Sequence, residues 1–220
     1  PADFQQGAEY PIERVSWHEA ALFANKLSEA EGFQLCYSCT GGENNTRCEE
    51  VMTPYTCSGF RLPTEAEWEY VCRAGNTGVH GFKMNDADQA KFKNVLSTDD
   101  ANMAKPSGSN RENNLYGNDP SKYSYKLFSM NRWGIYHMHG NVREWCYDYF
   151  TKRYSKVDGE EEEEYLFDPV GNLNGKHRVL RGGSYRSFWT QCRAAARDSA
   201  VPYEMMDDIG FRVVIGYPIR

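Results

Sequence analysis

The chain has 220 residues, of which 40% are hydrophobic and 14% aromatic, and it carries a formal net charge of −6. This length and composition support one hydrophobic core, so we expect a single domain over residues 1–220. Acidic residues outnumber basic ones by 31 to 25, and no basic cluster could neutralise a phosphate backbone, so nucleic acid is excluded as an expected partner. No run approaches the roughly 18 apolar residues of a membrane-spanning helix, so no transmembrane segment is expected.

The N-terminal part predicts a short strand and a helix. Residues 11–17 predict a strand that leads into a helix cap, because Ser16 is followed three residues later by Glu19, which completes a capping box. Gly32 is expected to end this helix. An apolar stripe at helical spacing supports the prediction, formed by Ala20, Ala21, Phe23, Ala24 and Leu27.

Four of the seven cysteines lie close together, in a segment rich in Thr, Ser, Asn and Gly: Cys36, Cys39, Cys48 and Cys57. A C-x2-C pair followed by two spaced cysteines could bind zinc tetrahedrally. The usual second C-x2-C pair is missing, however, so we favour two disulfides over zinc. Of the three possible pairings we favour Cys39–Cys48 with Cys36–Cys57. Such bridges would indicate an oxidising location: extracellular, cell-surface or periplasmic.

A second helix is predicted after Pro63. Thr64 and Glu67 form another capping box, and Glu65 also favours the positive N-terminal end of the helix. Gly75 is expected to stop it. The apolar positions that follow the cap are Ala66, Trp68, Tyr70 and Val71.

The remaining sequence is dominated by Gly, Asn, Pro, Ser and Asp. Segments 76–132 and 151–177 show little periodicity, which predicts long loops that are functional, tied by metal or disordered. Five consecutive carboxylates at 160–164 predict a solvated loop. Short apolar pieces at 134–136 and 211–215 predict short strands, so the fold class expected is α+β.

Three motifs follow one another along the chain. The first is residues 61–70 (RLPTEAEWEY) and the second is residues 140–145 (GNVREW). The third, C-terminal motif has two parts, residues 178–184 (RVLRGGS) and 209–214 (IGFRVV). In these motifs the chain resembles the formylglycine-generating enzyme, or sulfatase-modifying factor, family. That family has a variant of the C-type lectin fold. The resemblance implies two helices, small antiparallel sheets and abundant irregular coil.

The resemblance also implies a calcium site. Family members often bind calcium through main-chain oxygens at the positions of Gly140 and Val142 and through the carboxylate at the position of Glu144. Calcium prefers six to eight oxygen ligands. The chain departs from the pattern at His137, where the family has Asn or Asp and an imidazole is a poor ligand. The resemblance thus implies calcium as a cofactor, and the alternative is that Glu144 binds nearby backbone amides.

Catalysis in the family depends on copper(I) bound by two thiolates, three and eight residues after the position of Ser184. Here these residues are Ser187 and Cys192. A hydroxyl cannot replace a soft thiolate ligand, so copper is not expected and these three positions are vestigial. Relatives with a cysteine at position 72 often pair it with one in the last motif, which implies a Cys72–Cys192 bridge. Cys146 is expected to be a small buried hydrophobic residue.

Residues 185–208 combine aromatic, Arg and Met side chains, which binding surfaces favour. Several of them, Trp189 above all, could instead pack in the core. We predict a non-catalytic module that binds a protein or glycan through this loop, with help from the acidic 151–170 loop. The candidate ligand-binding residues are Tyr185, Arg186, Phe188, Trp189, Tyr203, Met205 and Met206.

Three other functions stay open. A subset of lectin-fold relatives has a C-terminal segment diversified by retroelements, and this chain could be such a variable receptor. It could be a copper-dependent oxidase acting on sulfatases. It could also be a scaffold domain with one tight partner. Pro1 is an unnatural first residue, so the missing signal peptide indicates no compartment. We also expect the domain to be the exported part of a larger protein.

Overall fold

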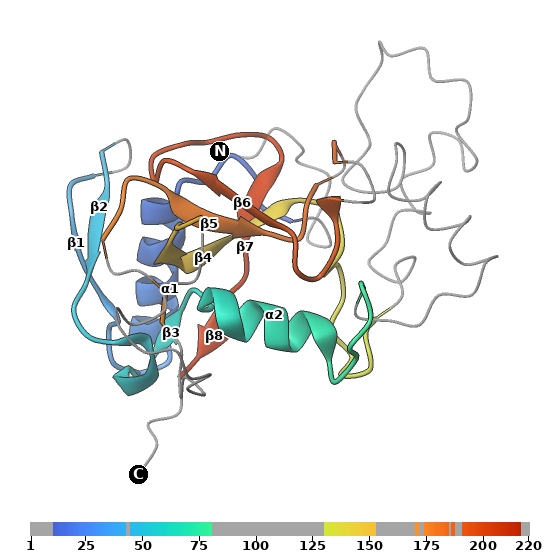
Figure 1. Cartoon of the computed structure of the whole chain (residues 1–220). Coiled ribbons are helices and arrows are strands. Elements are labelled where there is room, and N and C mark those ends of the chain that lie inside the picture. Colours follow the sequence, from blue (N-terminus) through green and yellow to red (C-terminus); the bar gives the residue numbers. More distant parts are fainter. Residues whose placement is uncertain are drawn as a thin grey trace, which may run out of the picture.

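The computed structural model describes residues 11–42, 45–80, 130–152, 170–171, 174–184, 186–187 and 191–216. Within these ranges, neither α-helix has the length or the apolar composition needed to cross a bilayer. Figure 1 shows the elements, which are α1 (Trp17–Ala30), β1 (Tyr37–Thr40), β2 (Arg47–Glu50), the 3-10 helix η1 (Pro54–Thr56), β3 (Phe60–Arg61), α2 (Glu65–Arg73), β4 (Arg143–Tyr149), β5 (Arg178–Arg181), β6 (Arg197–Ala200), β7 (Ile209–Phe211) and β8 (Val214–Ile215).

Helix α1 begins at the predicted cap. The Ser16 hydroxyl accepts from the Glu19 amide, and the Ser16 amide donates to the Glu19 carboxylate at 2.8 Å. The strand expected before the cap is wrong, because residues 11–15 pair with no strand among the described residues. Arg14 has a φ of 54°, and its amide donates to the carbonyl of Met206 at 3.1 Å. This N-terminal segment therefore packs against the loop before β7 instead of joining a sheet.

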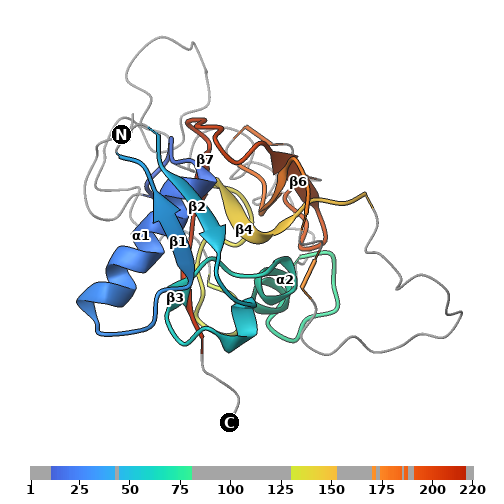
Figure 2. The same ribbon diagram turned by 90° about the vertical axis from the view of Figure 1, so that its left-hand side faces the viewer.

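The two expected disulfides are present in the hairpin region. Cys39 and Cys48 face each other across the antiparallel β1–β2 pair and are bonded, and Cys36 is bonded to Cys57. Zinc coordination by these four cysteines is thereby excluded. Figure 2 shows the hairpin from the side, with β1 and β2 in front of the rest of the domain.

Helix α2 also begins at its predicted capping box. The Thr64 hydroxyl accepts from the Glu67 amide, and the Glu67 carboxylate accepts from the Thr64 amide at 2.8 Å. Arg61 donates to both oxygens of Glu67 at 2.7 Å, which ties β3 to the first turn of α2. The helix ends at Arg73, and Ala74 takes a left-handed conformation with φ 45°.

The largest sheet has four strands in the order β6-β5-β4-β7. In Figure 1, α2 runs below this sheet, and α1 and the β1–β2 hairpin lie to its left. The expectation of antiparallel sheets is wrong for one pair, because β4 and β7 are parallel. No short hairpin turn joins these two strands, so their relative direction is decided by tertiary packing.

The two apolar pieces behave differently from the prediction. Residues 134–136 form no strand, because the Gly134 amide closes a turn onto the Asn131 carbonyl at 3.0 Å. Residues 211–215 are divided between β7 and β8, and β8 pairs with β3 in a separate sheet. A switch between sheets within five residues leaves no periodic signal in the sequence.

The core joins α1, the hairpin and the four-stranded sheet. Trp17, Trp145 and Leu180 are completely buried in it. Cys146 is also fully buried, as predicted, and lies in a second apolar cluster with Trp68 under the sheet. Two helices, small sheets and irregular connections confirm the predicted α+β class.

Candidate functional site

The Gly182–Gly183 turn brings the three sequence motifs together. Both glycines have positive φ, 94° and 71°. The Gly182 carbonyl accepts from the Gly140 amide at 2.8 Å, and a Cβ on Gly182 would lie 3.2 Å from the Trp68 ring. Residues with a Cβ are disfavoured at such φ values, and a Cβ at position 182 would also crowd the Trp68 ring. For these reasons the turn requires glycine.

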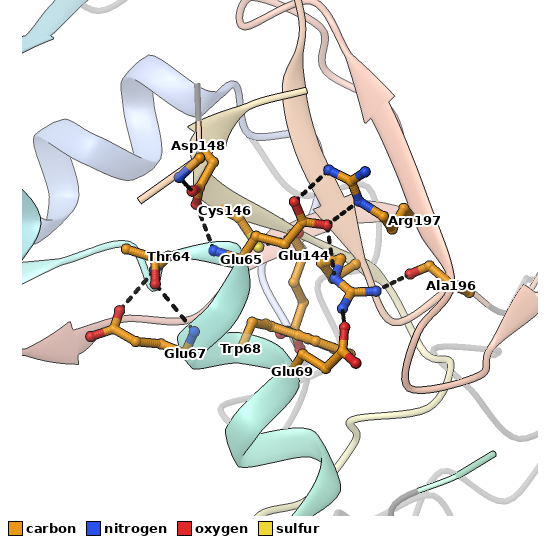
Figure 3. Close-up of polar contacts among 12 residues, drawn as sticks. Thr64, Glu65, Glu67, Trp68, Glu69, Glu144, Cys146, Asp148, Ala196 and Arg197 are labelled. Carbon is orange, nitrogen blue, oxygen red and sulfur yellow. Dashed lines mark hydrogen bonds and ion pairs between the residues drawn. The ribbon is translucent and has the colours of Figure 1, made fainter. Parts of the chain in front are cut away.

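Buried ion pairs fix this turn to α2 (Figure 3). Arg197 donates to both carboxylate oxygens of Glu65, at 2.5 and 2.7 Å, and Arg181 pairs with Glu69. The Asp148 carboxylate accepts from the Glu65 amide at 2.5 Å at the helix N-terminus. Burial of this carboxylate raises its pKa to about 6. The acidic residues of α2 therefore position β5 and β6, and none of them is free for chemistry.

Ser184 and Ser187 hold the start of the 185–208 loop. The Ser184 hydroxyl donates to the Asp208 carboxylate at 2.8 Å, and the Ser184 amide donates to the Ser187 hydroxyl at 2.9 Å. Arg143 donates to the other oxygen of Asp208 at 2.6 Å. Ser184 and Asp208 thus join the two ends of the loop.

Cys72 and Cys192 are free thiols, so the implied bridge between them is wrong in this structure. The imidazole of His139 lies between the two residues: its Nε2 is 3.5 Å from the Cys72 sulfur, and its Nδ1 is 2.7 Å from the Cys192 carbonyl. Since a carbonyl only accepts, Nδ1 carries the proton and Nε2 faces the thiol.

Burial keeps this cluster neutral. It raises the pKa of both Cys72 and Cys192 to about 12, and it lowers the pKa of His139 to about 4. Copper(I) ligation requires thiolates. With Ser187 at one of the two thiol positions, the residues present do not fit the two-thiolate copper site that the resemblance describes.

The predicted calcium residues also have partners within the protein. Both oxygens of Glu144 accept from the Arg212 guanidinium at 2.5 Å, and one of them accepts from the Trp68 indole at 2.6 Å. His137, where the family has Asn or Asp, has φ 61° and its Nδ1 lies 3.0 Å from the Asn141 side chain. Across the described ranges, no three His, Cys, Asp or Glu side chains converge to hold a metal ion. Calcium at this loop, bound in part by the main-chain oxygens of Gly140 and Val142, therefore stays a prediction.

Three of the predicted contact residues are exposed on the loop between β6 and β7. The exposed fraction is 59% for Tyr203, 52% for Met205 and 39% for Met206. The backbone beneath them is fixed, because the Trp17 amide donates to the Pro202 carbonyl at 2.9 Å and Arg14 donates to Met206. This segment arches over the sheet in Figure 1. It is an exposed apolar surface on an anchored backbone.

The other predicted contact residues divide into two groups. Arg186 is exposed and pairs with Asp207 at 2.6 Å. The predicted contact residues Tyr185, Phe188 and Trp189 lie outside the described residues, as does the predicted solvated loop at 160–164. Sequence reasoning missed the anchors Arg143 and Asp208. The signals for them were the place of Arg143 in the 140–145 motif and the acidic pair, Asp207 and Asp208, that directly precedes the 209–214 motif.

A family model described as "Sulfatase-modifying factor enzyme 1-like domain" matches residues 1–217. The chain is 34% identical over 160 residues to the formylglycine-generating enzyme of Mus musculus. The match covers 71% of this chain and 39% of that protein. The chain therefore spans well under half the length of this relative.

Solved structures are also similar. Treponema denticola variable protein 1 superposes with a TM-score of 0.67 and 25% sequence identity, covering 97% of this chain and 73% of that one. The structure of CarF has a TM-score of 0.55 at 26% identity, covering 98% and 70%.

Proposed function

The chain belongs to the sulfatase-modifying factor enzyme 1-like family, and within that family we propose that it is a non-catalytic module which binds a protein or glycan. The observation that carries the proposal is the surface of Tyr203, Met205 and Met206, exposed on a backbone held by Arg14 and Trp17. Aromatic and Met side chains on a preorganised loop bury much area at low entropic cost on binding.

The residues at the family's two thiol positions support a binding role over an oxidase. In the family, catalysis depends on two thiolates. Here Ser187 stands at one position and accepts a hydrogen bond from Ser184, and Cys192 at the other is fully buried with a raised pKa. The hydroxyl of Ser184 is itself engaged with Asp208. Ser184 and Ser187 therefore serve to hold the start of the 185–208 loop.

The formylglycine-generating oxidase is the alternative that the 34% identity to the mouse enzyme favours. It predicts thiol-dependent copper(I) binding and conversion of a peptidyl cysteine to an aldehyde. Titration with copper(I), followed by incubation with a sulfatase-derived peptide, separates the two proposals. We expect neither copper binding through Cys192 nor aldehyde, and the appearance of both would establish the oxidase.

Similarity to a variable protein favours a second alternative, a receptor whose C-terminal loop is diversified. The gene's surroundings test it, because diversification by a retroelement requires a near-repeat of the loop sequence that differs mainly at adenines. For either binding role, the two disulfides support an extracellular, cell-surface or periplasmic location within a larger exported protein.

Binding can be tested with arrays of cell-surface proteins and of glycans. The variant combines Tyr203→Ala with Met205→Ala, and the control is Tyr70→Ala. Tyr70 is 68% exposed on α2, and α2 lies below the sheet in Figure 1, on the side away from the loop between β6 and β7. Truncating central contact residues weakens binding by about tenfold or more, so captured signals should fall in the double variant alone. Equal signals for the double variant and wild type would contradict the proposed surface.

A further inference from the structure

An arginine of the β1–β2 hairpin lies against the exposed loop between β6 and β7. Arg47, the first residue of β2, is exposed, and its guanidinium carbon lies over the Tyr203 ring, 5.7 Å from the ring centre. At this distance an arginine is attracted to an aromatic face. In Figure 1 the hairpin stands to the left of the loop that contains Tyr203. Two segments that are far apart in the chain therefore form one surface.

The backbone on both sides of this surface is anchored to the start of α1. Cys48, which follows Arg47, is in the disulfide across the hairpin, and its amide donates to Nδ1 of His18 at 3.1 Å. The Trp17 amide donates to the Pro202 carbonyl at 2.9 Å. Because Trp17 and His18 are neighbours in the first turn of α1, that turn holds both halves of the surface. A partner would thus meet side chains whose backbone needs little further ordering.

The Arg47 guanidinium forms no ion pair with a carboxylate in the part of the chain that the structure describes. The imidazole of His18 lies beside it, with 3.5 Å between Nη1 of Arg47 and Nε2 of the ring. Burial lowers the pKa of His18, which favours the neutral ring. Since Nδ1 accepts from the Cys48 amide, Nε2 of the neutral ring carries the proton and cannot accept from Arg47. The guanidinium therefore keeps its N–H donors for a partner.

We propose that this extended surface, formed by Arg47 with Tyr203, Met205 and Met206, binds an acidic peptide segment of a partner protein. A carboxylate of the segment would pair with the Arg47 guanidinium, whose planar fork suits a two-point contact with a carboxylate. An apolar side chain beside that carboxylate would cover Tyr203 and the two methionines. The inference rests on the proposed function, because it gives a partner chemistry to the same surface.

The charges around the surface favour an acidic partner. Two exposed arginines border it: Arg47 at the Tyr203 ring, and Arg14, whose amide donates to the Met206 carbonyl at 3.1 Å. Within residues 203–206 the one carboxylate is that of Glu204, which is only partly exposed. Opposite charges across an interface steer association and select among partners.

The two methionines favour a peptide over a glycan. Met205 and Met206 are exposed, and a thioether offers a weak acceptor and no donor. Sugar hydroxyls placed on them would lose hydrogen bonds to water and gain few in return, which costs free energy. Apolar side chains of a peptide carry no such cost, and methionine side chains adapt to their shape.

The test uses an array of synthetic peptides in matched pairs. One member of each pair has an aspartate or glutamate next to a leucine, phenylalanine or methionine, and the other has the corresponding amide at the acidic position. Wild-type protein should capture the acidic members about tenfold more strongly, since a charge-assisted contact is lost in the amide members. Arg47→Gln should capture both members alike. Because Arg47 is exposed, this variant should keep its Tm within about 2 °C of wild type.

Arg132→Gln is the matched control and should keep the tenfold preference. Arg132 is also exposed, but it lies in the turn that the Asn131 side chain fixes to the Val71 carbonyl of α2 at 2.6 Å. Arg47→Lys keeps the charge without the planar fork and should retain part of the preference.

The inference is overturned if wild-type protein captures no peptide or shows no preference for the acidic members. An undiminished preference in Arg47→Gln overturns it as well. The proposed function survives these outcomes as long as the Tyr203→Ala and Met205→Ala double variant loses capture on the protein or glycan arrays. Unchanged capture by that double variant would instead refute the surface itself, so the two failures are distinguishable.

Discussion

Asp208→Asn is expected to destabilise the domain, because Asp208 anchors the end of the 185–208 loop. Its side chain is 7% exposed and accepts from Arg143 at 2.6 Å and from Ser184 at 2.8 Å. Asparagine has nearly the same size, but it loses the charge and must point its NH2 group at one of these donors. Losing one charge-assisted bond and leaving a buried donor unsatisfied costs about 2–3 kcal/mol. For a domain of this length that corresponds to a Tm decrease of about 4–12 °C.

The matched control is Asp198→Asn. Asp198 pairs with the same guanidinium at 2.9 Å, but its side chain is 57% exposed, so water and salt screen the contact. Its loss should cost about 0–1 kcal/mol. Urea unfolding followed by tryptophan fluorescence measures both variants, and an unchanged m-value would show that the same transition is compared. Equal losses in the two variants would refute the idea that burial of Asp208 makes it the anchor.

Three more predictions concern the buried cluster, the tight turn and the disulfides. The pKa of His139 is lowered from 6.5 to about 4 by burial, so the native state binds fewer protons than the unfolded state between these values. The free energy of unfolding should fall by up to about 1.4 kcal/mol per pH unit as the pH decreases through that window. Urea titrations at several pH values measure this dependence. His139→Gln should reduce the slope of unfolding free energy against pH, whereas the control His177→Gln should not. Gly183→Ala should cost about 2–4 kcal/mol, because its Cβ would lie 2.6 Å from the Cys192 sulfur at a φ of 71°. Gly134→Ala has a similar φ and open space, so a loss of about 1–2 kcal/mol in the same assay is expected, and equal losses would exclude the steric reason. Alkylation in denaturant without reductant should label three cysteines, and labelling of all seven would contradict the two disulfides.

Local signals in the sequence determined where the two helices begin and favoured disulfides over zinc at the four clustered cysteines. Ser16 with Glu19 and Thr64 with Glu67 fix both helix starts, because capping is a contact between residues three apart. The nested cysteine pairing was the favoured one of three that the sequence allowed, and the structure confirms it. Resemblance to the family supplied the fold class, which the two helices and small sheets confirm.

The contacts that form the site depend on residues far apart in the chain. Arg212 meets Glu144 across 68 residues, and His139 meets Cys192 across 53. Neither periodicity nor motif spacing contains that information, because these side chains are brought together by the parallel β4–β7 pairing and the turn at Gly182. For this reason only the tertiary structure showed that Arg212 pairs with Glu144 and that Cys192 forms no bridge with Cys72, which the family resemblance had implied.

The sequence by itself determined where the helices begin and that one of the two family thiols is a hydroxyl, but it left three pairings open for the four clustered cysteines. Only the tertiary structure decided that Tyr203, Met205 and Met206 are exposed, since exposure depends on what the rest of the chain covers. It also decided that buried carboxylates are satisfied by arginines. A charge removed from water must find its partner in three dimensions, and that partner can lie anywhere along the chain.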